Sequence, residues 1–295
     1  MTIAACYLSD EGVVLGADST VTMYVESSDT GIAMHHYDFA QKIFEFGDRG
    51  STAAVLFWGL ADLGKKSLRT FVAEVADEAN DRKLGSLPEV SSLIASMFWA
   101  DYRDAFAGPM ERVRLLLDKG DQRTEDETSE LYWRQEALSG GFCVGGRWGR
   151  KRQPGAFEVL FDPAPPDTPA PSPVRACEAT FWGCPWLLER LIYGLDRNLF
   201  AAILDSGKWV GTAEDLVELI GDTALRRPRD LPLREAIDLI YASIYVTIKT
   251  MKFSQLPPVC GGPIEIAVVS SDREFRWVTH KEMAEALIER RATHG

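Results

Sequence analysis

The chain opens with the stretch Ile3-Ala-Ala-Cys-Tyr-Leu8, Ser9-Asp-Glu-Gly12 and Val13-Val-Leu-Gly-Ala17, which predicts two strands joined by a tight turn. The residues of the second strand are almost all apolar. Such a composition is typical of a strand that is buried on both faces. The chain therefore begins with a hairpin that other elements must cover on both sides.

Apolar runs predict further strands, and apolar residues at helical spacing predict helices between them. The predicted strands after the opening hairpin span residues 41–46, 51–58, 137–145, 156–161, 177–182, 263–270 and 274–278. The predicted helices span residues 60–80, 88–119, 185–205 and 233–252, with a short one from residue 281. Four strands therefore precede the first helix. This order favours two sheets with helices outside, and not the alternating strands and helices of a doubly wound fold.

Two segments are predicted to be loops inside one domain. The stretch Asp121 to Glu130 is charged and has no apolar face, so it is predicted to be a mobile loop. The Pro-rich stretch Asp162 to Pro173 is short and lies between two predicted strands, so it is not a linker between domains. We therefore predict a single domain over residues 1–295, with loop insertions near residues 120–130 and 149–173.

Composition excludes several classes of partner. The 295 residues include 32 Lys and Arg against 44 Asp and Glu, and the formal net charge of −12 disfavours binding to nucleic acid or to an anionic membrane surface. The cysteines form no Cys-x-x-Cys pair and the histidines have no metal-ligand spacing, so neither a metal site nor another cofactor is expected. The first residues lack the features of a secretory signal, and no apolar run is long enough to span a bilayer. We expect a cytoplasmic protein.

Thr2 is a candidate nucleophile because it follows Met1 directly. A small residue in second position permits removal of the initiator Met by the cell's aminopeptidase, and Thr2 then carries a free α-amine. An α-amine has a reference pKa of ~7.7–8.0, so much of it is neutral near pH 7 to 8 and it can act as a base. One residue can therefore supply both the nucleophile and its general base.

Asp18 and Lys42 are the candidate partners of Thr2. Asp18 ends the second predicted strand, and Lys42 begins the strand that runs to Phe46. Both lie at strand ends, where the two charges can pair beside the first strand. The Lys42 ammonium would then stabilise the negative charge that develops as the Thr2 hydroxyl loses its proton.

These features resemble the proteasome β-subunits and their bacterial relatives, which are N-terminal nucleophile hydrolases. The resemblance lies in Thr2-Ile-Ala-Ala with the acidic hairpin at residues 10–22, in Gln41-Lys42-Ile-Phe-Glu-Phe, in Trp58-Gly59-Leu-Ala-Asp62 and in Gly261-Gly262-Pro-Ile-Glu-Ile-Ala-Val. Agreement of several spaced motifs is more specific than a single motif. The resemblance implies an α+β fold, a four-layer αββα sandwich of two antiparallel sheets flanked by helices.

The resemblance also implies a role for each matching residue. Thr2 would be the nucleophile, its amine the base acting through a water, Lys42 the electrostatic activator and Asp18 the group that orients Lys42. The backbone N–H groups at Trp58 and Gly59 would bind the oxyanion, a contact worth ~10²–10³ in rate. The implied activity is that of a threonine peptidase of bacterial type, which hydrolyses peptides or unfolded proteins through an acyl-enzyme inside a ring-shaped homo-oligomer. An unfoldase or activator partner is left unspecified.

Three positions depart from the pattern of this family. Trp58 stands where the family has the first of two glycines, and Cys184 and Cys260 stand where it has serines near the nucleophile. An aspartate that the family places shortly before the late glycine pair is absent. Cys184 and Cys260 are therefore candidates for a shell that supports the nucleophile, although burial as small apolar residues explains them as well.

Two other functions remain open from the sequence. A small-amide acylase of the same fold would show no activity on peptides, and a non-catalytic ring or scaffold subunit would be unaffected by Thr2→Ala. The apolar residues Val21, Ala40, Leu56 and Leu60 fall near the positions that line the pocket for the residue preceding the scissile bond in the family. Ordinary core packing explains these residues equally well, so no cleavage preference is predicted.

Overall fold

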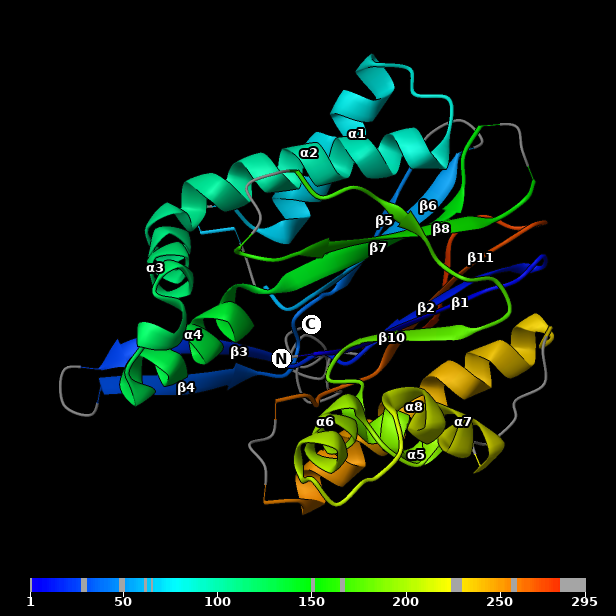
Figure 1. The fold of residues 1–295 in the computed structure, drawn as a ribbon. Coiled ribbons are helices and arrows are strands. Elements are labelled where there is room, and N and C mark those ends of the chain that lie inside the picture. The colour runs from blue at the N-terminus through cyan, green and yellow to red at the C-terminus, as the bar shows by residue number, and fades with distance from the viewer. Residues whose placement is uncertain are drawn as a thin grey trace, which may run out of the picture.

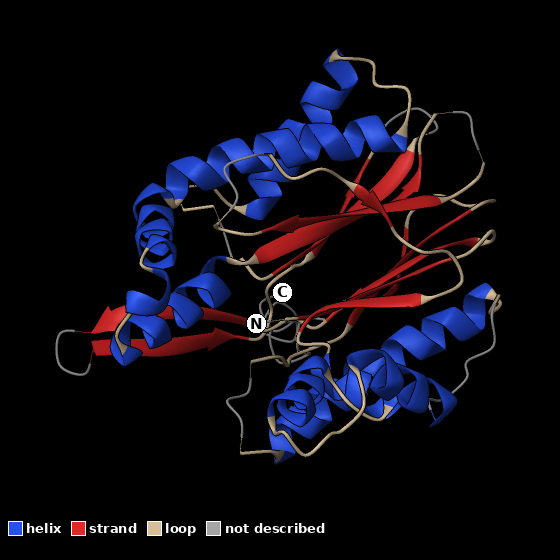
Figure 2. Ribbon diagram, in the orientation of Figure 1, coloured by secondary structure: helices blue, strands red, loops and turns tan. Residues whose placement is uncertain are grey.

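The computed structural model describes residues 2–27, 31–47, 51–60, 63–64, 66–149, 152–164, 168–223, 230–255 and 259–281. Two antiparallel sheets of five strands lie face to face, as Figures 1 and 2 show. The first has the strand order β10 (Ala179–Gly183), β1 (Ile3–Leu8), β2 (Gly12–Ala17), β11 (Glu265–Ser270) and β12 (Arg276–Thr279). The second has the order β5 (Ile43–Phe46), β6 (Thr52–Trp58), β7 (Gly140–Arg147), β8 (Gly155–Phe161) and β9 (Ser172–Pro173).

Helices cover the outer face of each sheet (Figure 1). Over the second sheet lie α1 (Leu68–Asp81) and α2 (Leu87–Ala105), and α3 (Ala107–Asp118) and α4 (Glu125–Leu138) follow them. Over the first sheet lie α5 (Trp186–Tyr193), α6 (Arg197–Asp205), α7 (Ala213–Thr223) and α8 (Leu233–Phe253). The predicted four-layer αββα sandwich is confirmed. None of the helices in the described ranges is long and apolar enough to cross a membrane.

Alternation along the strands produces three separate cores. Ala4 and Cys6 of β1 face the second sheet, whereas Ile3, Ala5 and Tyr7 of the same strand face α5 and α8. The strands of the second sheet alternate in the same way, with one face toward the inter-sheet core and the other toward α1 and α2. All six residues of β2 are buried, which confirms that this strand is covered on both faces.

The structure corrects the prediction that residues 121–130 form a mobile loop. Residues Gly120–Gln122 form a 3₁₀ turn, and α4 begins at Glu125. Thr124 and Glu127 form a reciprocal capping box at the start of α4. Capping and the acidic first turn stabilise the helix N-terminus. Helical periodicity missed α4 because few of its residues are buried, so it has little apolar face.

Other elements differ from the prediction as well, and the helix predicted over 185–205 is divided into α5 and α6. Six strands precede the first helix, because β3 (Val21–Ser27) and β4 (Gly31–Tyr37) form a hairpin that projects from the sandwich (Figure 1). The helix predicted over 88–119 is divided at Phe106 into α2 and α3. Pro109 falls in the first turn of α3, where a missing N–H costs nothing. Helix α7 was not predicted, and the helix predicted from residue 281 lies outside the described residues. The single domain over 1–295 stays a prediction.

Gly16 on β2 allows α8 to approach the first sheet closely. A Cβ at this position would lie 2.5 Å from Cγ2 of Ile240 and 2.8 Å from Cδ1 of Ile244. We expect Gly16→Val to lower the free energy of unfolding by about 1–3 kcal/mol, because the added methyl groups overpack this contact. Urea denaturation followed by circular dichroism measures the change.

Gly221 on α7 is the matched control for this substitution. A Cβ there would meet no atom within 4 Å, and Gly221→Val is expected to leave the free energy of unfolding within about 0.5 kcal/mol of the wild type. A Gly16→Val protein as stable as the wild type would show that α8 does not pack against β2 as described.

Candidate active site

Thr2 lies at the start of β1, where the neighbouring strand end holds its backbone. Its carbonyl oxygen accepts hydrogen bonds from the backbone N–H of Cys184 (2.9 Å) and from the Cys184 thiol (3.3 Å). Gly183 has a φ of +83°, and a Cβ there would lie 1.8 Å from the Thr2 carbonyl oxygen. Only glycine fits at this position. Thr2 is buried, with 4% of its surface exposed.

Asp18 joins four separate parts of the chain through its buried carboxylate. Oδ1 accepts hydrogen bonds from the backbone N–H of Ile3 (3.1 Å) and from Nζ of Lys42 (2.6 Å). Oδ2 accepts from the backbone N–H groups of Thr20 (3.2 Å) and Gly261 (2.9 Å). Asp18 is fully buried, and such a charge is tolerated only when it is paired and hydrogen-bonded. The structure therefore brings Asp18 and Lys42 together beside the first strand, as the sequence predicted.

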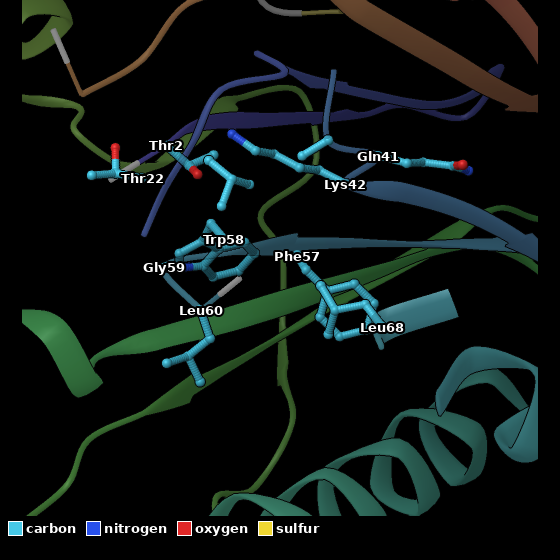
Figure 3. A pocket seen from close by; sticks show the side chains of 11 residues that line it. Thr2, Thr22, Gln41, Lys42, Phe57, Trp58, Gly59, Leu60 and Leu68 are labelled. Atoms are coloured by element: carbon cyan, nitrogen blue, oxygen red, sulfur yellow. The ribbon is translucent and has the colours of Figure 1, made fainter. Parts of the chain in front are cut away.

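A small pocket joins Thr2, Lys42 and the Trp58–Gly59 turn. Figure 3 shows the Lys42 side chain extending toward Thr2 across this space. The space that the centre of a water molecule can occupy is about 40 Å³, so the pocket is small. The lining residues are Thr2, Val21, Thr22, Ala40, Gln41, Lys42, Phe57, Trp58, Gly59, Leu60 and Leu68. Leu56, which the sequence placed among the pocket residues, instead packs in the core between the sheets.

The Trp58–Gly59 turn follows β6 and is packed against the start of β7. Gly59 has a φ of +85°, and a Cβ there would lie 2.4 Å from the backbone oxygen of Ser139. Glycine is required by both the conformation and the space. The backbone of this turn lies in the wall of the pocket that also contains Thr2. Its assignment as the oxyanion-binding group stays a prediction.

Cys184 and Cys260 are both buried and belong to the same apolar cluster as Ile3 of β1. Cys184 contacts Thr2 directly, whereas the Cys260 thiol donates to Sδ of Met251 at 3.4 Å. A hydrogen bond with the Cys184 thiol, together with burial, raises the pKa of the Cys260 thiol well above its usual range. Cys260 is therefore a neutral thiol at physiological pH and neither a nucleophile nor a base.

Glu265 and Lys281 form a second charge pair, with a buried carboxylate and a partly buried ammonium, that sequence reasoning missed. Glu265 on β11 is fully buried, and its carboxylate lies 3.4 Å from Nζ of Lys281 and 2.8 Å from Nδ1 of His280. Nζ of Lys281 also donates to the carbonyl oxygen of Phe39 at 3.1 Å, which ties it to the segment leading into Lys42. The available signal was a lone charge in the apolar run from residue 263 to 269.

Metal ligation has no support in the described ranges, which contain no group of three His, Cys, Asp or Glu side chains placed to hold an ion. The side chains of His35 and His36 lie outside the described residues.

Comparison with known proteins corrects the family assignment. No family model matches the chain, and no curated protein matches it. A similar solved structure is that of the Anbu (Gly-1) mutant from Hyphomicrobium sp. strain MC1, with 14% sequence identity, coverage of 100% of this chain and 98% of that chain, and a TM-score of 0.46. The prediction that the chain is a proteasome β-subunit-like protein is therefore wrong, because no family model matches it and this similar structure is distant and of a different family. The chemistry of the site rests on the residues of this chain.

The buried pair of Asp18 and Lys42 is expected to be strongly coupled. Lys42→Met leaves a buried carboxylate without its cation, and Asp18→Asn leaves a buried ammonium without its anion, so each is expected to cost about 3–5 kcal/mol of stability. The double variant is expected to lose less than the sum, because it leaves neither charge uncompensated. Urea denaturation of the four proteins measures the coupling, and additive losses would contradict the pairing.

The raised pKa of Cys260 predicts its reactivity. Alkylation requires the thiolate, so Cys260 is expected to resist iodoacetamide in the folded protein at pH 8 and to react after denaturation. Peptide mass spectrometry of the alkylated protein measures the labelling of this residue. Equal labelling of Cys260 before and after denaturation would overturn the description of its environment.

Proposed function

We propose that this chain is an N-terminal threonine hydrolase that cleaves amide bonds after removal of Met1. The observation that carries the proposal is the buried Lys42–Asp18 ion pair beside the pocket that contains Thr2. A buried cation next to a hydroxyl favours the deprotonated oxygen, and it lowers the pKa of a nearby amine. Clustered groups of this kind are typical of catalytic sites.

The reaction follows from the positions of these groups. The neutral α-amine of Thr2 accepts the hydroxyl proton through a water, and Oγ1 attacks the substrate carbonyl carbon. The oxyanion that forms accepts hydrogen bonds from backbone N–H groups of the Trp58–Gly59 turn. The C–N bond then breaks, and the leaving amine takes the proton from the Thr2 ammonium. Water hydrolyses the remaining ester and regenerates Thr2.

Asp18 has a positioning role in this proposal. Its carboxylate holds Lys42 at 2.6 Å and the backbone N–H of Ile3 at 3.1 Å, so the cation and the strand that carries Thr2 share one anchor. The Cys184 N–H and thiol hold the Thr2 carbonyl from the other side. The nucleophile is therefore held at its backbone while its hydroxyl is left for chemistry.

The finer proposal is a threonine peptidase acting on peptides or unfolded proteins. The small pocket supports a second candidate, a small-amide acylase, because the described residues around Thr2 leave only about 40 Å³ for the centres of water-sized groups. A panel of fluorogenic peptides and N-acyl amides separates the two. Turnover of the amides without turnover of the peptides would favour the acylase.

Self-association is proposed from the hairpin of β3 and β4. A two-stranded hairpin is only marginally stable alone in water, and this one projects from the sandwich (Figure 1). Tyr37, the last residue of β4, is 58% exposed. Contact with a second copy in a ring would cover it. We also propose a reducing, cytoplasmic setting, because none of the five cysteines is in a disulfide bond.

A peptide epoxyketone tests the central proposal, because its closed adduct needs a hydroxyl and a free amine on one residue. We expect intact mass spectrometry to show loss of Met1 and one adduct per chain. Thr2→Ala is expected to abolish the adduct, Thr2→Ser to retain it, and Lys42→Met to slow its formation by about 10²-fold or more.

Two results would contradict the proposal. One is a chain that keeps Met1 and takes no adduct, which would favour a non-catalytic scaffold subunit. The other is an adduct that persists in Thr2→Ala, which would place the nucleophile elsewhere.

A further inference from the structure

Two indole rings stack on one another between the sheets at the end that carries the site. The ring centroids of Trp58 and Trp182 are 4.5 Å apart, and the ring planes are within 7° of parallel. Trp58 ends β6 in the second sheet, and Trp182 on β10 in the first sheet pairs with Ala4, two residues from Thr2. Both indoles are buried. The stack therefore connects the strand neighbouring the nucleophile to the turn that forms the opposite wall of the pocket.

A hydrogen bond from Trp182 also connects the first sheet to the second. Nε1 of Trp182 donates to Oε2 of Glu158 at 2.6 Å, and Glu158 belongs to β8 of the second sheet. A bond to a charged acceptor is stronger than one between neutral groups. Trp182 thus belongs to one sheet by its backbone and contacts the other through both its ring face and its N–H.

The surrounding backbone leaves room for this stack and for little else. A Cβ at Gly141 would lie 2.5 Å from Cζ2 of Trp58, so the neighbouring strand β7 provides the space for the indole by lacking a side chain. Beyond Trp58, the Gly59 backbone packs directly against Ser139 and Gly140. The turn is therefore held by backbone contacts on one side and by the indole stack on the other.

We propose that Trp182 and Glu158 are positioning residues that set the distance between Thr2 and the backbone N–H groups of the Trp58–Gly59 turn. The inference rests on the proposed function. Neither side chain lines the pocket, so each acts through Trp58 and through the spacing of the sheets. Oxyanion stabilisation depends on donors placed within hydrogen-bond distance of the developing charge. A misplacement of about 1 Å can lower the rate by about 10²-fold.

The control is Trp148, a buried indole after β7 that also has one aromatic neighbour and one Nε1–H hydrogen bond. Trp148 is also 7% exposed, its ring lies 5.7 Å from that of Phe46, and its Nε1 donates to the carbonyl oxygen of Leu84 at 2.8 Å. Trp148→Phe and Trp182→Phe therefore remove the same atoms from two equally buried positions. Only Trp182 lies beside the site.

The kinetic measurement is the epoxyketone reaction of each variant at several reagent concentrations. Trp182→Phe and Glu158→Ala are expected to lower the maximal rate of adduct formation by about tenfold, while the half-saturating concentration stays within about twofold. Glu158→Gln keeps an acceptor oxygen and is expected to restore the rate. Trp148→Phe is expected to react as the wild type does, even if its melting temperature falls equally.

Hydrogen exchange provides a readout that does not depend on catalysis. Trp182→Phe is expected to speed amide exchange over residues 56–60 by about tenfold, and Trp148→Phe is expected to leave those amides unchanged. Unchanged exchange over residues 56–60 in Trp182→Phe would overturn the inference, whether or not the wild type reacts with the epoxyketone. Faster exchange with an unaltered reaction rate would also overturn it, because the stack would then hold the turn without positioning the chemistry.

These outcomes separate the two proposals. If the wild type forms no adduct, the proposed function is contradicted. The exchange measurement then still decides whether the indole stack holds the Trp58–Gly59 turn. If the wild type reacts and adduct formation is slowed equally in Trp182→Phe and Trp148→Phe, only the positioning role is contradicted.

Discussion

The buried carboxylate of Asp18 is the constraint on which the site depends. A charge removed from water must be matched by donors, and Asp18 has four of them, from β1, from its own loop, from the residue before β5 and from the segment before β11. Those segments can satisfy the carboxylate only when both sheets are assembled. The geometry around Thr2 therefore forms only when the whole sandwich is folded. The interactions that stabilise the fold are the same ones that hold the site in place.

Two further contacts across the sheets extend this dependence. The Trp58–Trp182 stack joins the sheets at the pocket, and the Glu265–Lys281 pair ties β11 to the segment that leads into Lys42. Both contacts act on the backbone that carries the reacting groups, and of their four side chains Trp58 alone lines the pocket. Glycines at positions 59, 141 and 183 allow the close packing around the site. A Cβ at any of these positions would clash with a neighbouring atom and push the backbone away.

The pattern of apolar residues predicted those elements whose apolar positions are also the positions that the fold buries. The opening hairpin and the buried β2 were predicted from their apolar runs. Apolar residues at helical spacing predicted helices over 60–80, 88–119 and 233–252, and the structure has helices at 68–81, 87–105 and 233–253. The patterns missed α4, which is held by its cap and by charge pairs such as Glu130 with Arg112 and Arg134, and they missed β3 and β4. Resemblance to proteasome β-subunits led to the right architecture and to the wrong family, because short spaced motifs reflect a fold more than a lineage.

The sequence by itself determined which chemical groups are available and which segments are buried. It determined that Thr2, Asp18 and Lys42 lie at strand ends, that five cysteines are spread along the chain, and that residues 13–17 are apolar enough to be enclosed. Only the tertiary structure decided which strand ends meet and that Cys184 holds the Thr2 carbonyl. It also decided that the Trp58 indole stacks on Trp182 instead of being exposed to solvent. The physical reason is that periodicity reports the burial of a residue, whereas a partner distant in the sequence is chosen by the packing of two sheets.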